Sequence, residues 1–318
     1  MTARSAYIHV PFCKYKCGYR NFSNVAGRDD LVPAFLAAIE LEMERKLPDR
    51  TSPEPSVELD SLYLGGWTPS YLSLPDLQRL LELLAARFRL SENAEYTCEA
   101  HPLDCTAERL EQLRLAGVNR LSIAGQSFQA RKLHRLQHAH TGDHLRDSMR
   151  RVMVAFGNVS LNLVFAVPGE TLAEWRADLE AAIELAPQHV SIHRLVIERG
   201  SAFFSHAKRG RLREVEEDLQ LAMHKLAIER LKAAGYELYC EHDTEYHFAL
   251  PGFECRHHIA HNVADASGES RWAFGPGAVS VFDGLRSTNH RSTTTYIRRL
   301  IKQDPSDQTD PTDQTRSV

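Results

Sequence analysis

The chain has 318 residues, of which 43% are hydrophobic and 25% are charged, and its formal net charge is -4. This balance is typical of a globular protein with a large core, and it gives no overall electrostatic footprint for nucleic acid. No apolar run reaches the roughly 18 residues that a transmembrane helix needs, and the N-terminus lacks the apolar region of a signal peptide. We therefore expect a cytosolic protein with no transmembrane segment and no nucleic-acid partner.

Short apolar segments alternate with amphipathic ones along most of the chain. About six βα units in series favour an α/β fold, with a parallel sheet that is either open or closed into a barrel. Both architectures place their functional site at the C-terminal ends of the strands. Strands are predicted at 6–10, 61–64, 95–99, 120–124, 160–167, 189–197 and 236–240. Helices are predicted at 33–47, 74–88, 107–115, 172–185 and 214–234, with helical segments between 131 and 156.

The first strand leads into a loop with the pattern C-x3-C-x2-R, formed by Cys13, Cys17 and Arg20. A [4Fe-4S] cluster with one open iron needs three thiolates on a short loop, so this is an incomplete cluster-binding pattern. A zinc or redox site would prefer C-x2-C, and a pair of structural cysteines is a further alternative. The remaining four cysteines are expected to be small buried hydrophobes: Cys98, Cys105, Cys240 and Cys255.

Glycines and polar residues follow the next strands. Gly65 and Gly66 come directly after the second strand and would let the backbone approach a ligand closely, although an ordinary tight turn needs glycine too. Glu99 and Gln126 end later strands and could hydrogen-bond a polar ligand, or they could be satisfied loop residues. Thr171 is a plausible N-cap of the helix that follows it, and Gly117 is predicted to close helix 107–115 as a C-cap glycine.

Three histidines follow Cys255 in the last third of the chain: His257, His258 and His261. Imidazoles at this density could ligate a metal or a haem iron. Solvated histidines in a loop are the alternative.

Taken together and in order, these segments resemble the radical S-adenosylmethionine (SAM) family of oxygen-independent coproporphyrinogen III oxidases and haem chaperones of the HemW type. The resemblance runs from about residue 5 to about residue 285, and the early position of the cysteine loop fits the chaperone branch better. It is carried by Tyr7-Ile8-His9-Val10-Pro11-Phe12-Cys13, Cys17-Gly18-Tyr19, Gly65-Gly66, Thr68-Pro69-Ser70, Glu99, Ala116-Gly117-Val118-Asn119-Arg120-Leu121-Ser122-Ile123, Gln126-Ser127-Phe128, Pro168-Gly169, Ile197-Glu198, Cys255-Arg256-His257 and Gly275-Pro276-Gly277-Ala278.

The resemblance implies a partial (β/α)6 TIM-type barrel over residues 1–235 and a short C-terminal extension over 236–302 that packs on it. The polar, repetitive segment 303–318 has nothing to bury, and we expect it to be disordered. The family further implies a [4Fe-4S] cluster on three cysteines, with SAM bound at the open iron and cleaved to a radical. It assigns SAM contacts to Tyr7, Tyr19, Gly65, Gly66, Thr68, Glu99, Gln126, His138 and Asn162.

The departures from the family pattern fall on this site. Arg20 takes the place of the third cysteine, and a guanidinium stays protonated and cannot ligate iron. Trp67 replaces a glycine, His138 replaces an arginine, and Asn162 replaces an aspartate. In the turn around Pro168-Gly169, Ala166 and Glu170 replace glycine and glutamine. In the HNxxYW-like motif of the chaperones only the first residue remains, with these residues at its four positions: His257, His258, His261 and Asn262.

Three interpretations remain open. The first is a haem-binding or haem-trafficking protein that uses His257, His258 or His261 as axial ligand, has an impaired cluster site, and has haem or porphyrin and haem-receiving proteins as partners. The second is a degenerate, non-catalytic relative. The third is an active radical-SAM enzyme with a substitute third ligand, for which Cys98 and Cys105 are candidates.

Overall fold

The structure is a computed structural model that describes residues 3–14, 17–19, 25–47, 57–267, 270–302 and 314–316. Only the backbone is described for 262–267 and 314–316. Arg20 and most of the segment predicted to be disordered, 303–318, lie outside the described residues.

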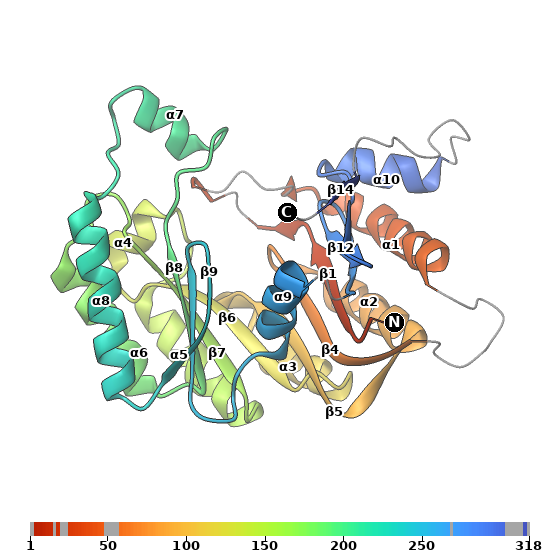
Figure 1. The fold of residues 1–318 in the computed structure, drawn as a ribbon, viewed down its shortest axis with the longest axis horizontal. Helices are drawn as coiled ribbons and strands as arrows, with labels where there is room; N and C mark the ends of the chain where they lie inside the picture. The colour runs from red at the N-terminus through yellow and green to blue at the C-terminus, as the bar shows by residue number, and fades with distance from the viewer. Residues whose placement is uncertain are drawn as a thin grey trace.

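The centre of the fold is a nine-stranded, mostly parallel sheet wrapped by helices (Figure 1), in the order β11-β1-β4-β5-β6-β7-β8-β10-β9. From β11 to β8 neighbouring strands are parallel, whereas β10 is antiparallel to both β8 and β9. The strands of this sheet are β1 (Ser5–Val10), β4 (Val57–Gly66), β5 (Phe88–Ala100), β6 (Arg120–Gln126), β7 (Val159–Phe165), β8 (His189–Arg194), β9 (Glu237–His242), β10 (Glu245–Ala249) and β11 (Trp272–Phe274).

Two small sheets lie outside the main one. The first pairs β2 (Phe12–Cys13) with β3 (Val25–Ala26), and the second contains β12 (Val279–Phe282), β13 (Leu285–Thr288) and β14 (Gln314–Arg316). The α-helices are α1 (Val32–Lys46), α2 (Leu74–Arg87), α3 (Ala107–Leu115), α4 (Ala130–Arg135), α5 (Gly142–Ala155), α6 (Leu172–Leu185), α7 (Ala202–Lys208), α8 (Glu217–Ala233), α9 (Arg256–Ser267) and α10 (Thr293–Ile301). Short 3-10 turns are η1 (Asp29–Leu31), η2 (Pro69–Tyr71) and η3 (Pro102–Asp104). Among the described helices, none combines the length and the apolar character needed to cross a membrane.

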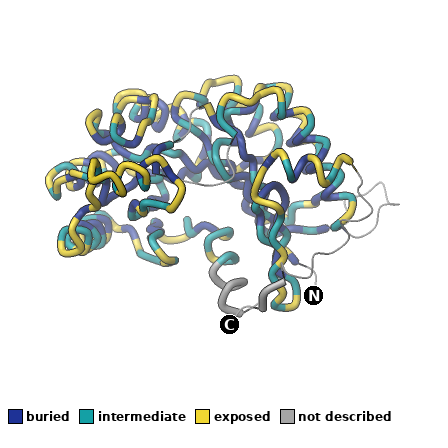
Figure 2. The backbone as a smooth tube through the Cα atoms, turned by 90° about the horizontal axis from the view of Figure 1, so that it is seen from above, coloured by how far each residue is buried: buried dark blue, intermediate teal, exposed yellow. Residues whose placement is uncertain are grey.

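The six parallel strands β1 and β4 to β8 are each followed by helical crossover segments, which confirms the predicted α/β class and the partial (β/α)6 barrel. The apolar spacing of the helices accounts for their packing. On α2, for example, Leu77, Leu80, Leu81 and Leu84 are all buried, so that one stripe of the helix faces the sheet. Figure 2 shows the result, with buried strands inside and exposed residues on the outer sides of the helices.

The segment after residue 235 completes the main sheet at both edges. β9 and β10 extend it beyond β8, and β11 pairs with β1 at the opposite edge. Glu42, a buried carboxylate on α1, fixes this segment by accepting hydrogen bonds from Gly275 N at 2.9 Å and from Tyr296 OH at 2.5 Å. α10 lies beside α1 in Figure 1, in agreement with these contacts.

Candidate functional site

A cavity of about 660 Å³ lies at the C-terminal ends of the strands, and α9 forms part of its wall. The structure brings almost all of the residues predicted for cofactor binding to this wall. Gly65 is not part of the described wall; it packs against the Tyr63 ring, where a Cβ would come within 2.6 Å. The predicted residues on the wall are Tyr7, Cys13, Cys17, Tyr19, Gly66, Thr68, Glu99, Gln126, His138, Asn162, His257, His258 and His261.

Glu99 is held at the end of β5 by two neighbours from β4. Its Oε1 accepts a hydrogen bond from Tyr63 OH at 2.8 Å, and its Oε2 accepts one from Gly66 N at 3.1 Å. Burial, reinforced by the carboxylate of Glu99, raises the pKa of Tyr63 well above its ordinary value. Tyr63 therefore stays a neutral donor, and Glu99 presents an oriented carboxylate to the cavity.

His257 packs over two neighbouring tyrosines of the sheet. Its ring stacks on Tyr63 with centroids 4.2 Å apart and on Tyr7 with centroids 5.5 Å apart. Strand register places Tyr7 directly beside Tyr63, which creates the aromatic surface for this stack. Burial lowers the pKa of His257 well below its ordinary value, so the imidazole is neutral.

The interpretation of these histidines as solvated loop residues is wrong, because His257 and His258 lie on α9 and are only partly exposed. The helix begins where a distant carboxylate binds its N-terminus. Glu95 Oε1 accepts hydrogen bonds from Arg256 N and from Cys255 Sγ, both at 3.1 Å, and Glu95 also pairs with buried Arg120 at 3.3 Å. A carboxylate at this helix end is electrostatically favourable.

His258 belongs to a hydrogen-bonded group centred on Tyr239. Tyr239 OH lies 3.0 Å from His258 Nδ1 and 2.8 Å from His189 Nε2, and it accepts a hydrogen bond from Cys255 N at 3.1 Å. The His258 ring stacks on His247 with centroids 3.7 Å apart. Burial lowers the pKa of His258 well below its ordinary value, and it lowers the pKa of His247 to about 3.

Asn162 and Gln126 reach the cavity from adjacent strands. Asn162 Nδ2 donates to Ser122 Oγ at 3.0 Å, which fixes the amide against β6. Gln126 ends β6 with a φ of 61°, a left-handed conformation that is uncommon for a residue with a side chain. Trp67 also lines the cavity, and its backbone N donates to Val10 O at 3.0 Å.

A buried ion network supports the turn after Gln126, and nothing in the sequence pattern indicated it. Lys132 Nζ donates to Asp178 at 2.9 Å and also to Glu170, the residue that replaces glutamine in the turn after β7. Asp178 in turn accepts hydrogen bonds from Ser127 Oγ at 2.7 Å and from Phe128 N at 2.8 Å. The network therefore links α4, α6 and the ends of β6 and β7. Thr171 caps α6 in a capping box with Glu174, as predicted.

The cysteines divide into two groups by position. Cys13, on β2, is buried, and Cys17 is partly exposed; both line the cavity. Of the described cysteines, Cys98 and Cys105 are not on the cavity wall, and their thiols donate to backbone carbonyls behind it. Burial raises the pKa of Cys105 to about 11 and that of Cys98 further. Cys240, on the edge strand β9, is a cavity residue that sequence reasoning missed.

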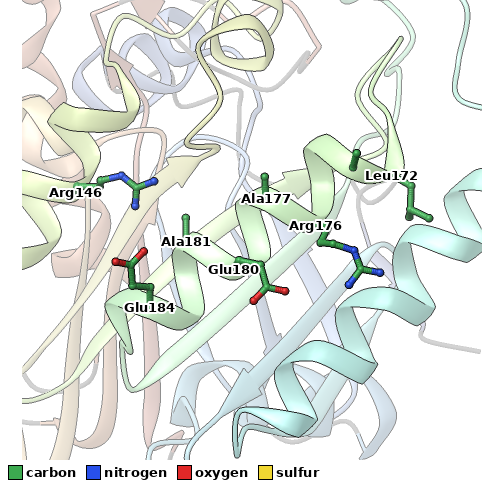
Figure 3. A pocket seen from close by; sticks show the side chains of 8 residues that line it. Arg146, Leu172, Arg176, Ala177, Glu180, Ala181 and Glu184 are labelled. Carbon is green, nitrogen blue, oxygen red and sulfur yellow. The ribbon is translucent and has the colours of Figure 1, made fainter.

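A second hollow of about 740 Å³ lies on the outer helical layer (Figure 3). It is an open surface along α6 whose charged side chains are partly paired, as in the contact of Glu180 with Arg230 at 2.7 Å. It lies away from the strand ends and gathers no histidine or cysteine among its described lining residues.

Comparison with known proteins agrees with this geometry. Residues 7–182 match the model of the radical SAM superfamily. The chain is 31% identical over 296 residues to the haem chaperone HemW of Bacillus subtilis, covering 92% of this chain and 75% of that protein. It is 33% identical over 314 residues to the haem chaperone HemW of Escherichia coli, with the same two coverages.

The chain belongs to the HemW family of radical SAM proteins. Its fold agrees with that assignment. The structure of the radical SAM enzyme coproporphyrinogen III oxidase, HemN, from Escherichia coli superimposes with a TM-score of 0.79 at 22% identity, covering 95% of this chain and 70% of that one. The lining of the cavity includes His138 and Asn162, two of the positions at which the sequence departs from the family pattern.

Proposed function

We propose that this HemW-family chain binds haem in the cavity and passes it on to other proteins, and that its cluster site is impaired. The observation that carries the proposal is the placement of His257, His258 and His261 on one cavity wall. Burial lowers the pKa values of His257 and His258, so these imidazoles are already in the neutral form that ligates iron. A volume of about 660 Å³ is within the range of cofactor pockets.

His258 is the axial ligand that the hydrogen bonds favour. In one tautomer, His258 Nδ1–H donates to Tyr239 OH, and the Tyr239 hydroxyl donates to His189 Nε2. Each of these two protons then has an acceptor. This tautomer leaves the lone pair of His258 on Nε2. A second hydrogen bond of this kind is the usual way in which proteins orient a metal-binding histidine.

The charge of the cavity suits the carboxylates of a haem. Arg271 and Arg286 both line the wall, and arginine binds carboxylate groups with two parallel hydrogen bonds. We infer that the propionates lie toward these two residues and the iron toward α9.

The donors on the cysteine loop support the impaired cluster. Two thiols, Cys13 and Cys17, line the cavity, and the third position of the loop is Arg20, which cannot be a ligand. Cys98 and Cys105, the proposed substitutes, are protonated thiols behind the described wall, which argues against the active-enzyme alternative.

Titration with haem under reducing conditions tests the proposal. Wild-type protein is expected to bind about one haem with the absorption spectrum of a histidine-ligated iron. His258→Ala should change the spectrum and weaken binding at least tenfold, because an axial ligand is lost. His206→Ala, which removes an exposed histidine on α7, is the matched control. Unchanged binding by a variant lacking His257, His258 and His261 together would overturn the ligand assignment.

A further inference from the structure

A second group of histidines lies at the cavity, and neither the family pattern nor the haem proposal uses it as a unit. His101 follows β5, and His138 and His140 lie in the segment between α4 and α5. Each offers a ring nitrogen, and the three nitrogens lie within 4.8 Å of one another. We propose that His101, His138 and His140 form a binding site for a divalent transition metal such as Zn²⁺, with one coordination position open to the cavity.

The arrangement of the rings has the geometry that such an ion requires. Their centroids are separated by 5.1 Å, 5.5 Å and 6.4 Å. Three imidazoles around one tetrahedral Zn²⁺, each with a Zn–N bond of about 2.0–2.1 Å, place their centroids roughly 5 Å apart. A shift of about an ångström in one side chain therefore closes the site around the ion.

His140 supplies the decisive observation. Its ring is 97% buried, with an exposed fraction of 3%, and its Nε2 donates to the backbone carbonyl of Gly125 at 2.9 Å. That bond places the proton on Nε2 and the lone pair on Nδ1. Nδ1 is buried and has no hydrogen-bond partner among the described residues. A buried acceptor without a partner is unfavourable, and a metal ion removes the penalty. A carbonyl bonded to the second nitrogen is the usual support of a metal-ligating histidine.

The other two histidines, His101 and His138, line the cavity, and hydrogen bonds fix the segments that carry them. His138 lines the cavity, and its backbone N donates to Leu133 O at 3.0 Å, which fixes the end of α4. His101 also lines the cavity, and its Nδ1 accepts a hydrogen bond from Leu103 N at 3.2 Å. Coordination through His101 Nε2 moves the proton to Nδ1, so the exposed hydrogen bond from Leu103 N is given up when the ion binds. All three ligands are nitrogen, a set typical of zinc, copper, iron or nickel sites.

A nearby lysine favours an anion as the fourth ligand of the ion held by His101, His138 and His140. Lys14 lines the same cavity as His101 and His138. A cation at this place opposes a bare dication but favours an anion, such as hydroxide or a carboxylate, in the open position. Because His101 and His138 line the cavity whereas His140 is buried behind them, that position faces the cavity.

The other described histidine triad, His189, His247 and His258, is a poorer metal site. His247 and His258 stack face to face with centroids 3.7 Å apart, which is too close for two ligands of one tetrahedral ion. Both ring nitrogens of His189 are hydrogen-bonded, to Ser160 Oγ and to Tyr239 OH. The two triads therefore differ in ring spacing and in the nitrogens available to an ion. The proposed metal site does not depend on haem binding.

Calorimetric titration of the metal-free full chain with Zn²⁺, and with Co²⁺ as a spectroscopic probe, tests the site. We expect about one tightly bound ion per chain and the strong visible bands of tetrahedral Co²⁺. His140→Gln retains a side-chain N–H for the Gly125 carbonyl and His101→Asn retains an acceptor for Leu103 N, yet each removes one ligand. Each of these variants, and His138→Ala, should weaken binding at least tenfold. His134→Ala, which removes an exposed histidine of α4, should bind as the wild type does.

One further variant distinguishes the histidines from the cysteine loop as ligands. A Cys13→Ser/Cys17→Ser double variant is expected to keep the bound ion and the same Co²⁺ spectrum. Loss of binding in that variant, or a thiolate charge-transfer band in the wild type, would assign the ion to the cysteine loop and overturn the proposal. Wild-type affinity in folded His138→Ala and His140→Gln proteins would also overturn it, and circular dichroism establishes that they are folded. No haem is present in these experiments, so their outcome is separate from that of the haem titration.

Discussion

The hydroxyl of Tyr63 donates a hydrogen bond of 2.8 Å to Glu99 Oε1, and the same tyrosine ring carries His257 at 4.2 Å. One side chain of β4 thus orients both the carboxylate end and the histidine end of the cavity. The two roles can be separated, because the hydroxyl makes the first contact and the ring makes the second.

Tyr63→Phe keeps the ring and removes the hydroxyl. We expect a loss of about 1–2 kcal/mol in the free energy of unfolding, since Glu99 loses a buried partner while the stack on His257 persists. Urea denaturation measures the loss. Tyr71→Phe removes an exposed hydroxyl that binds Asp29 and should cost less than about 0.5 kcal/mol. Equal losses in the two variants would contradict the role given to Tyr63.

The buried ion network gives a larger effect. Lys132→Met leaves Glu170 and Asp178 without their cation in a site that water does not reach, so we expect a loss of about 3–5 kcal/mol in the free energy of unfolding. Lys225→Met, on the exposed side of α8, should change it by less than about 0.5 kcal/mol. A small effect at Lys132, measured by urea denaturation, would mean that the network contributes little to the turn after β6.

Stability should fall in mild acid because of buried histidines. Burial lowers the pKa of His9 to about 4 and, with a smaller contribution from His140, that of His101 to about 4. Both values lie below the roughly 6.5 of an unfolded histidine, so the unfolded state takes up more protons between about pH 6.5 and 4. The stabilisation is complete above about pH 6.5 and is lost as the pH falls toward 4.

His9→Asn tests the pH prediction. It keeps a polar partner for Tyr7 OH, which lies 3.0 Å from His9 Nδ1, and removes one ionisable group. The slope of the unfolding free energy between about pH 6 and 4.5 should decrease by about 1.4 kcal/mol per pH unit. His134→Asn, on the exposed side of α4, is expected to leave the slope unchanged. The prediction fails if the two variants titrate alike.

The cysteines should differ in reactivity toward a thiol reagent. Cys17 is partly exposed at the cavity, whereas Cys98 and Cys255 are almost completely buried, with raised pKa values. Since the thiolate is the reactive form, native protein should be labelled first at Cys17. Mass spectrometry after brief alkylation identifies the site, and Cys17→Ser should remove the fast phase while Cys98→Ser keeps it. Fast labelling at Cys98 would contradict the placement of that residue behind the cavity wall.

Iron content tests the impaired cluster site. After anaerobic reconstitution, wild-type protein should hold far less than four iron atoms per chain, because the loop offers two thiols. Arg20→Cys with Trp67→Gly restores the third thiol and the family glycine, and iron and sulfide should rise together. Arg20→Lys with Trp67→Gly, which adds no thiol, is the control. A full cluster in the wild type would reject the impairment.

Local signals in the sequence were sufficient for most of the core. The predicted N-cap at Thr171 and the C-cap glycine at Gly117, with a φ of 88°, both depend on neighbouring residues and are confirmed. Six βα units could be counted for the same reason, since each contains its own apolar stripe and its own turn.

The features that the sequence did not reveal depend on distant contacts. The helix that carries His257 begins at a carboxylate, Glu95, that lies 161 positions away from Arg256, so no local pattern marks its start. The histidine group combines His101 with His138 and His140, and the H-x-H spacing of the last two is the local signal that could have pointed to it. Glu170 was interpreted as a substitution in a turn, whereas its partner Lys132 makes it part of the core.

The pairing of β1 with β11 has a consequence for biosynthesis. Tyr7 lies beside Ala273, so one edge of β1 has no sheet partner until β11, far along the chain, has also been synthesised. During that interval β1 presents an open strand edge, which is the kind of surface that pairs with other chains. Fragments that end before residue 272 should therefore aggregate more readily than the full chain, and binding of a chaperone to nascent chains should concentrate on those lacking β11.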